Sequence, residues 1–110
     1  MNNSKTRVYV TVHDKNSLLC FNMEGKKQYT YSPDNLKCPL GVAVDRDDNI
    51  YVVGYSSHNI HQLSPEGCII QVITTGVPHN PMAISFDNSR DTFIITNYSE
   101  KPKLHIYQLK

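Results

Sequence analysis

The stretch Ile50-Tyr51-Val52-Val53 has a near copy 42 positions earlier, Val8-Tyr9-Val10-Thr11. A two-residue insertion near Lys101 and Pro102 extends the alignment into a third copy, where it aligns Ile60 with Leu104 and Leu63 with Tyr107. The constant offset of 42 aligns further positions: Leu18 with Ile60, Phe21 with Leu63, Glu24 with Glu66, Gly25 with Gly67, Pro39 with Pro81, Leu40 with Met82, Val42 with Ile84, Val44 with Phe86, Asp45 with Asp87, and residues 51–53 with 93–95. One register that holds through three copies predicts a repeat protein.

Each copy consists of short β-rich runs separated by turn residues, and no segment shows helical spacing. The middle copy predicts strands at 41–44, 50–53, 59–63 and 69–73. The segment 64–67 reads Ser-Pro-Glu-Gly, which favours a reverse turn. Four strands in one repeat of about 40–45 residues are typical of a propeller blade. The predicted fold is therefore all-β, a partial β-propeller built from four-stranded antiparallel blades.

The strand count divides the chain into three parts. Residues 7–37 are expected to hold strands two to four of one blade, 38–79 a complete blade, and 80–110 the first three strands of another. Propellers have about 4–8 blades, each covered by its neighbours. We therefore expect missing blades or self-association to complete the ring, and an isolated chain that either folds poorly or associates.

Composition excludes several classes of protein. The 110 residues suffice for one small domain, and the net charge of +1, without blocks of like charge, argues against a strong phosphate-binding surface. Three cysteines without a C-x-x-C pair indicate reduced thiols and a cytoplasmic protein. No apolar run resembles a signal peptide or reaches the ~18 residues of a membrane helix, so no membrane association is expected.

The middle copy resembles the NHL repeat. Residues 39–45 read Pro-Leu-Gly-Val-Ala-Val-Asp, residues 49–52 read Asn-Ile-Tyr-Val, and His58 and Ile60 follow at the spacing of that repeat. The resemblance covers roughly residues 7–109 and is strongest in the middle copy. It is closest to the C-terminal propeller of tripartite-motif (TRIM) proteins of the NHL class, which implies a propeller that recognises a partner.

The sequence departs from the NHL pattern at two positions of the repeat. The Asp that follows the second strand in the family is Gly54 in the middle copy and Val12 in the first. The Arg before the third-strand isoleucine is replaced by Asn59, Ser17 and Lys103. The Asp–Arg contact that often braces such blades is therefore expected to be missing.

Neither metal binding nor catalysis is predicted. Asp45, Asp47 and Asn49 begin like a calcium loop, but Ile50 and His61 stand where that loop needs Gly and Glu, so a turn with local hydrogen bonds is predicted. His58 and His61 should point to opposite faces of an extended segment, and His105 repeats His61, which indicates a structural role. With no nucleophile motif or phosphate-binding glycine loop, we expect no catalytic residues, no metal and no cofactor.

The best candidate binding surface is one rim of the propeller. Loops after second strands and before first strands gather there, namely 13–16, 35–38, 55–58, 77–80 and 98–103. Exposed Tyr, His and Lys side chains can anchor a peptide or stack on bases, although solvated loops carry the same residues. The candidate rim residues are His13, Tyr55, His58, His79, Tyr98 and Lys101.

Three functional hypotheses follow from this reading. The leading one is a non-catalytic module that binds a protein partner through the rim, as the substrate-recognition end of a TRIM-like ubiquitin ligase whose catalytic module lies elsewhere. The alternative is single-stranded RNA binding on the same rim. The third is a fragment of a metal-dependent propeller lyase or esterase.

Overall fold

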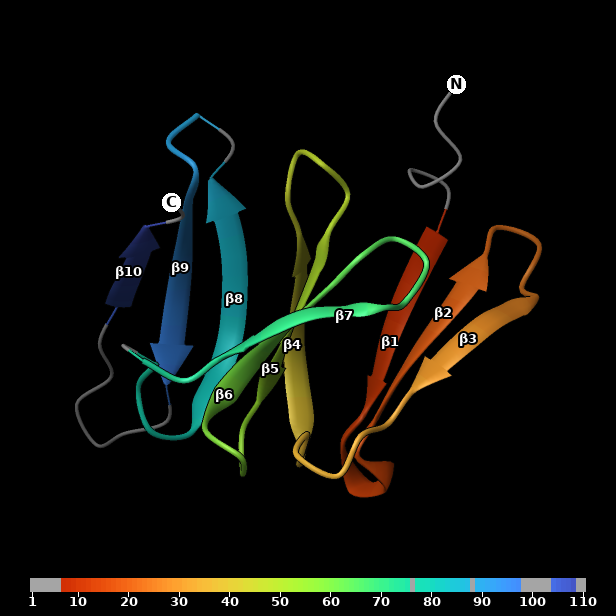
Figure 1. Ribbon diagram of the computed structural model, residues 1–110, viewed down its shortest axis with the longest axis horizontal. Helices are drawn as coiled ribbons and strands as arrows, with labels where there is room; N and C mark the ends of the chain where they lie inside the picture. Colours follow the sequence, from red (N-terminus) through yellow and green to blue (C-terminus); the bar gives the residue numbers. More distant parts are fainter. Residues whose placement is uncertain (1–6, 76, 88, 98–103, 109–110) are drawn as a thin grey trace.

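The computed structural model describes residues 7–75, 77–87, 89–97 and 104–108, and the regular structure in these segments is nearly all β-strand. The strands pair in sequence order into three antiparallel sheets that stand side by side (Figure 1): β1-β2-β3, β4-β5-β6-β7 and β8-β9-β10. This arrangement confirms the all-β partial propeller. The elements are β1 (Arg7–Val12), the 3-10 turn η2 (His13–Lys15), β2 (Ser17–Asn22), β3 (Lys27–Tyr31), β4 (Pro39–Val44), β5 (Ile50–Gly54), β6 (Asn59–Leu63), β7 (Ile69–Ile73), β8 (Pro81–Asp87), β9 (Thr92–Asn97) and β10 (Leu104–Gln108).

The middle sheet lies between the other two and is covered on both faces. Every residue of β5 and β6 is buried, which explains why β5 is apolar almost throughout. Its two faces belong to separate core clusters, and full burial of each aliphatic side chain contributes about 1.5–3 kcal/mol. The cluster toward the first sheet contains Leu18, Leu36, Ile50, Val52 and Leu63. The cluster toward the third sheet contains Tyr51, Val53, Ile60, Ile73, Ile84, Phe93 and Ile95.

Gly41 allows the first strands of two neighbouring sheets to come close together. A Cβ atom at this position of β4 would lie 2.8 Å from the carbonyl oxygen of Met82 and 2.9 Å from the Cα of Ala83, both in β8. Because these are backbone atoms, they could not move aside without shifting the strand. The glycine of the repeat is thus required by close packing between blades.

The register of β9 differs from the sequence alignment by one residue. Ile95 pairs with His105 in the third sheet, whereas Val52 pairs with His61 in the middle sheet, so Ile95 occupies the place of Val52. The constant offset of 42 predicts Ile94 at this place and is wrong for this strand.

The cause of the shift is a longer turn between β8 and β9. Phe86 pairs with Phe93, seven residues on, whereas Val44 pairs with Ile50, six residues on. The extra residue turns Phe93 toward the middle sheet, where its ring lies 4.2 Å from that of Tyr51 between centroids.

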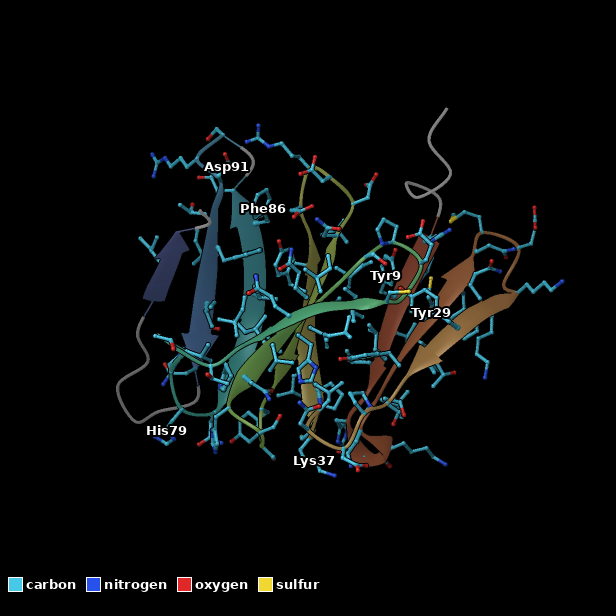
Figure 2. The ribbon with its side chains drawn as sticks, viewed as in Figure 1. Tyr9, Tyr29, Lys37, His79, Phe86 and Asp91 are labelled. Carbon is cyan, nitrogen blue, oxygen red and sulfur yellow. The ribbon has the colours of Figure 1, made fainter. Side chains whose placement is uncertain are left out.

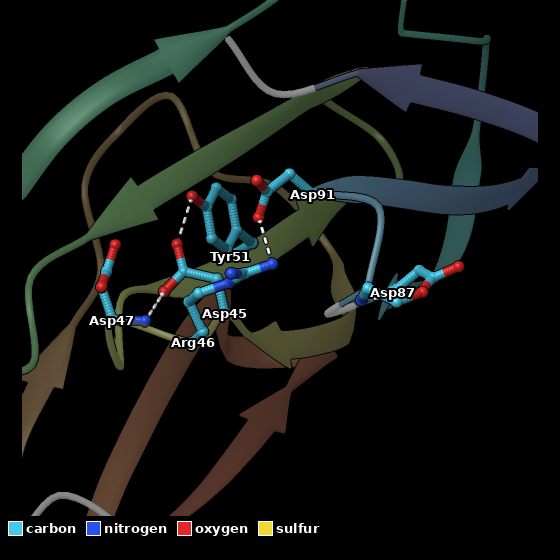
Figure 3. Close-up of polar contacts among 7 residues, drawn as sticks. Asp45, Arg46, Asp47, Tyr51, Asp87 and Asp91 are labelled. Carbon is cyan, nitrogen blue, oxygen red and sulfur yellow. Dashed lines mark hydrogen bonds and ion pairs between the residues drawn. The ribbon is translucent and has the colours of Figure 1, made fainter.

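Asp45 shapes the turn between β4 and β5. Its Oδ1 accepts hydrogen bonds from the backbone N–H groups of Asp47 (2.9 Å) and Asn49 (3.0 Å), and its Oδ2 accepts one from the Tyr51 hydroxyl (2.8 Å; Figure 3). These are the local bonds of the turn that the sequence predicts. The neighbouring Arg46 forms an ion pair of 2.7 Å with Asp91 in the β8–β9 turn (Figure 3).

A chain of polar side chains continues from Asp45 across the middle sheet, buried as far as Gln62 and ending at the exposed Gln71. The Tyr51 hydroxyl accepts a hydrogen bond from Gln62 Nε2 (2.8 Å), and Gln62 Oε1 accepts one from Gln71 Nε2 (2.7 Å). Each link joins residues paired across neighbouring strands. Burial raises the pKa of Tyr51, and the hydrogen bond to Asp45 adds to this effect, so the phenol remains a donor. Buried polar groups paired in this way are not left unsatisfied.

Replacing Tyr51 by Phe should destabilise the protein. The change removes the donor to Asp45 and the acceptor for Gln62, and leaving such buried groups unpaired costs about 1–3 kcal/mol. Urea denaturation measures this loss in the free energy of unfolding. The matched control is Tyr55→Phe, because Tyr55 is half-exposed, and its loss should stay below about 0.5 kcal/mol. Equal losses in the two variants would contradict the role of the polar chain.

Candidate functional site

The predicted rim loops lie together at one end of the three sheets. The turn η2, the β3–β4 loop, the β5–β6 turn and the described part of the β7–β8 loop gather at the lower end in Figure 1. Lys37 and His79 mark the same end in Figure 2. We define the rim as residues 13–16, 32–38, 55–58 and 77–80. Of the predicted rim residues, Tyr98 and Lys101 lie outside the described part of the chain.

A repeated side-chain cap joins the rim loops of successive sheets. Asn16 Oδ1 accepts a hydrogen bond from the backbone N–H of Cys38 (2.8 Å), and 42 residues later His58 Nδ1 accepts one from the backbone N–H of Asn80 (3.0 Å). All four residues have left-handed backbone angles, with φ between 50° and 53°. The cap therefore links the turn after β1 to the loop before β4, and the turn after β5 to the loop before β8.

Further hydrogen bonds hold the rim loops to one another. The loop before β4 pairs with the β5–β6 turn, because Ser56 N–H donates to the Lys37 carbonyl (3.1 Å) and Ser57 Oγ accepts from Lys37 N–H (3.0 Å). Asn80 Nδ2 donates to the Tyr55 carbonyl (3.1 Å). These contacts connect loops of the first, middle and third sheets into one surface.

The position where the NHL pattern has Asp is Gly54, and neighbouring polar side chains occupy its space. A Cβ atom on Gly54 would lie 2.6 Å from Asn59 Oδ1. Asn59 Oδ1 instead accepts a hydrogen bond from Ser57 Oγ (2.8 Å), and its Nδ2 donates to the Asn35 carbonyl (2.9 Å). Asn59 thus braces the rim at the position where the NHL pattern has an Asp–Arg contact.

His61 lies fully buried beneath the rim and links it to the first sheet. Its Nε2 lies 3.2 Å from the Asn35 carbonyl and its Nδ1 lies 2.7 Å from the Tyr31 hydroxyl. Because a carbonyl only accepts, Nε2 carries the proton and Nδ1 accepts from Tyr31. Burial lowers the pKa of His61, and the hydrogen bond to Asn35 offsets part of this effect. The neutral ring therefore has a structural role, joining the middle sheet to the first sheet and to the rim loop that follows it.

The rim presents a small group of exposed and half-exposed side chains. His13, Lys37 and His79 are exposed, and Tyr55 and His58 are half-buried. The rings of His58 and His79 meet edge to face, with centroids 4.9 Å apart. Across the described segments, no group of three or more His, Cys, Asp or Glu side chains is placed to hold a metal ion. No described helix has the length and apolar character to cross a bilayer.

Sequence reasoning missed the asparagines that organise the rim. Asn16 and Asn80 form the caps and Asn35 supplies the carbonyl below them, yet none was a candidate. One signal was present, because Asn16 stands 42 positions before His58 and both side chains can accept a hydrogen bond.

Replacing His58 by Ala should weaken the rim, whereas His58→Asn should preserve it. The Asn side chain can accept the Asn80 N–H as Asn16 accepts that of Cys38, and Asn tolerates a positive φ. Loss of the cap in the Ala variant should cost about 0.5–2 kcal/mol. Amide hydrogen exchange by NMR should show faster exchange of the Asn80 N–H in that variant. Unchanged exchange in His58→Ala would contradict the cap.

His61 should make stability fall as the pH falls below 6.5, the ordinary pKa of His. Because the pKa of His61 is lower in the folded state, the unfolded chain binds the proton first as the pH falls. The contribution of the neutral ring to the free energy of unfolding is therefore complete above pH 6.5, and it is lost as the pH falls toward the folded-state pKa. A difference of one unit between the two pKa values amounts to about 1.4 kcal/mol.

The control for His61 is His61→Gln, which keeps the other histidines. Urea denaturation between pH 7.5 and 5.5 should show a steeper loss of stability in the parent protein than in the variant. Parallel curves would show that His61 does not remain neutral in the folded state.

Comparison with known proteins shows the same fold. A sequence profile described as a β-propeller repeat matches residues 33–61. A streptogramin B lyase structure matches with a TM-score of 0.69 and 21% identity, covering 98% of this chain and 39% of that one. Virginiamycin B lyase from Staphylococcus aureus matches with a TM-score of 0.69 and 16% identity, covering 94% and 38%. A chain of a nidogen/laminin complex matches with a TM-score of 0.63 and 16% identity, covering 98% and 48%.

No curated protein matches the sequence. The chain spans about two fifths of the length of the lyases and about half that of the nidogen/laminin chain. At these identities the likeness concerns the fold alone. The chain is thus a stretch of β-propeller whose rim loops are joined into one surface.

Proposed function

We propose that this chain is a non-catalytic recognition module that binds a protein partner through the rim. The observation that carries the proposal is the repeated cap formed by Asn16 and His58, which joins loops of successive sheets. A surface whose loops are already fixed loses less conformational entropy when a partner binds. Following the NHL resemblance, the module serves as the substrate-recognition end of a cytoplasmic, TRIM-like ubiquitin ligase.

The charge of the rim favours a protein partner over RNA. In the four described rim loops Asp14 and Asp34 balance Lys15 and Lys37, so the net charge of these loops is zero with neutral histidines. The predicted rim loop 98–103 adds one acidic and two basic residues. RNA binding depends on clustered positive charge along the phosphate backbone. An aromatic and imidazole surface without excess charge is better suited to a peptide or protein.

The positions of the histidines support a non-catalytic role. His58 accepts a backbone hydrogen bond through Nδ1, and both ring nitrogens of His61 have structural partners. These side chains are therefore used in joining loops and sheets. The alternative of a metal-dependent lyase rests on likeness of fold, which does not determine chemistry.

Site-specific photo-cross-linking in cell extract tests the proposed function. A benzophenone amino acid placed at Lys37 or at His79 should capture the same protein, and the capture should resist ribonuclease. The matched control is the same amino acid at Met23, which is 68% exposed in the β2–β3 turn at the opposite end of the sheets (Figure 1). Capture from Met23 alone would contradict the rim as the binding surface.

A second measurement separates protein binding from RNA binding. Fluorescence anisotropy with a labelled oligouridine at physiological salt should show no binding by the chain. Binding that is lost in Tyr55→Ala would instead support single-stranded RNA as the ligand.

A further inference from the structure

One face of the first sheet is apolar and exposed. Val8 and Val10 are 44% and 40% exposed, whereas Ile50 and Val52, their equivalents 42 residues later, are fully buried. Val8 pairs with Phe21 and Val10 with Leu19 across β1 and β2, so the four side chains share this face. We call it the leading face (Val8, Val10, Leu19 and Phe21).

The third sheet has an exposed face on the opposite side of the structure. Ile94 pairs with Ile106, which is 68% exposed, and this pair repeats that of Tyr51 with Gln62 in the middle sheet. Thr96, two residues after Ile94, lies on the same face. We call it the trailing face (Ile94, Thr96 and Ile106).

The two junctions inside the chain show which faces pack together. The Tyr9 and Leu18 side of the first sheet packs on the Ile50 and Val52 side of the middle sheet. In the same way, the Tyr51 side of the middle sheet packs on Phe93 and Ile95 of the third. In the repeat, the trailing face is equivalent to the Tyr51 side of the middle sheet, and the leading face is equivalent to its Ile50 and Val52 side. The trailing face of one chain can therefore pack on a leading face in the way these sides pack inside the chain.

We propose that a second copy of this chain places its trailing face on the leading face, so that copies associate head to tail. The residues that define the two faces are uncharged. Lys27, which pairs with Phe21, lies beside the leading face, and Asp87, which pairs with Thr92, lies beside the trailing face. A head-to-tail contact that repeats the rotation between blades closes into a ring. The matched propeller chains are about two to two and a half times as long, so two or three copies would supply the length of such a ring. The ring would place the rims of all copies around one axis.

Substitutions on the two faces test this association in the full 110-residue chain. Size-exclusion chromatography with light scattering should give a mass of at least two chains for the parent protein. Val10→Lys and Ile106→Lys should each raise the dissociation constant at least tenfold, because each buries a lysine in an apolar contact. The control Met23→Lys changes a side chain as exposed as Ile106, at 68%, and should keep the parent mass.

Mixing the two face variants identifies the head-to-tail contact. The Val10→Lys chain keeps an intact trailing face and the Ile106→Lys chain an intact leading face, so an equimolar mixture should form a complex of two chains. This complex also shows that both variants are folded. A monomeric parent protein, an association that only one variant weakens, or a mixture that stays monomeric would each overturn the proposal.

Discussion

The middle sheet of this protein has two largely apolar faces, and water is excluded from both. The middle sheet shows how this is done, because β5 and β6 are buried throughout and their side chains divide between two clusters completed by neighbouring sheets. A lone twisted sheet of four short strands could not exclude water in this way. The stability of the fold therefore depends on the junctions between sheets, and the backbone contact of Gly41 with β8 is part of one junction.

The repeat made most of the fold predictable, and the exception has a physical cause. Strands β6 and β7 have the predicted bounds because turn residues delimit them on both sides. The register of β9 was not predictable, because residues 93–95 are all large and apolar, and a shift of one position leaves an equally good alignment. A one-residue shift nevertheless exchanges the two faces of a strand. Only cross-strand pairing shows that Phe93 and Ile95 face the middle sheet.

The location of the candidate site could be predicted from the sequence, but the hydrogen bonds that hold its loops together could not. Strand order alone puts Tyr55, His58 and His79 on one rim, since alternate turns of antiparallel strands lie at the same end. The contacts that hold the rim depend on partners distant in sequence, such as His61, which lies 30 residues after Tyr31. The caps were hidden for another reason. Asn and His differ as residue types, and their common property at this position is an acceptor atom on a left-handed backbone.

The two ends of the sheets are held together in different ways, and this difference favours the rim as the binding end. At the opposite end, Asp45 and Asp87 bond within their own turns. The contacts between sheets there include packing of the Tyr29 ring on Gly67 and the polar contacts of two long arginine side chains, Arg7 to the Pro65 carbonyl and Arg46 to Asp91. The Arg46–Asp91 pair is about half exposed, and such pairs typically contribute ~1 kcal/mol or less. At the rim, short side chains and backbone groups bond loop to loop. A contact made through a short side chain or the backbone leaves less conformational freedom between two loops than one made through a long side chain, so the rim loops keep their relative positions. Residues on different loops can then contact one partner at the same time, which a recognition surface requires.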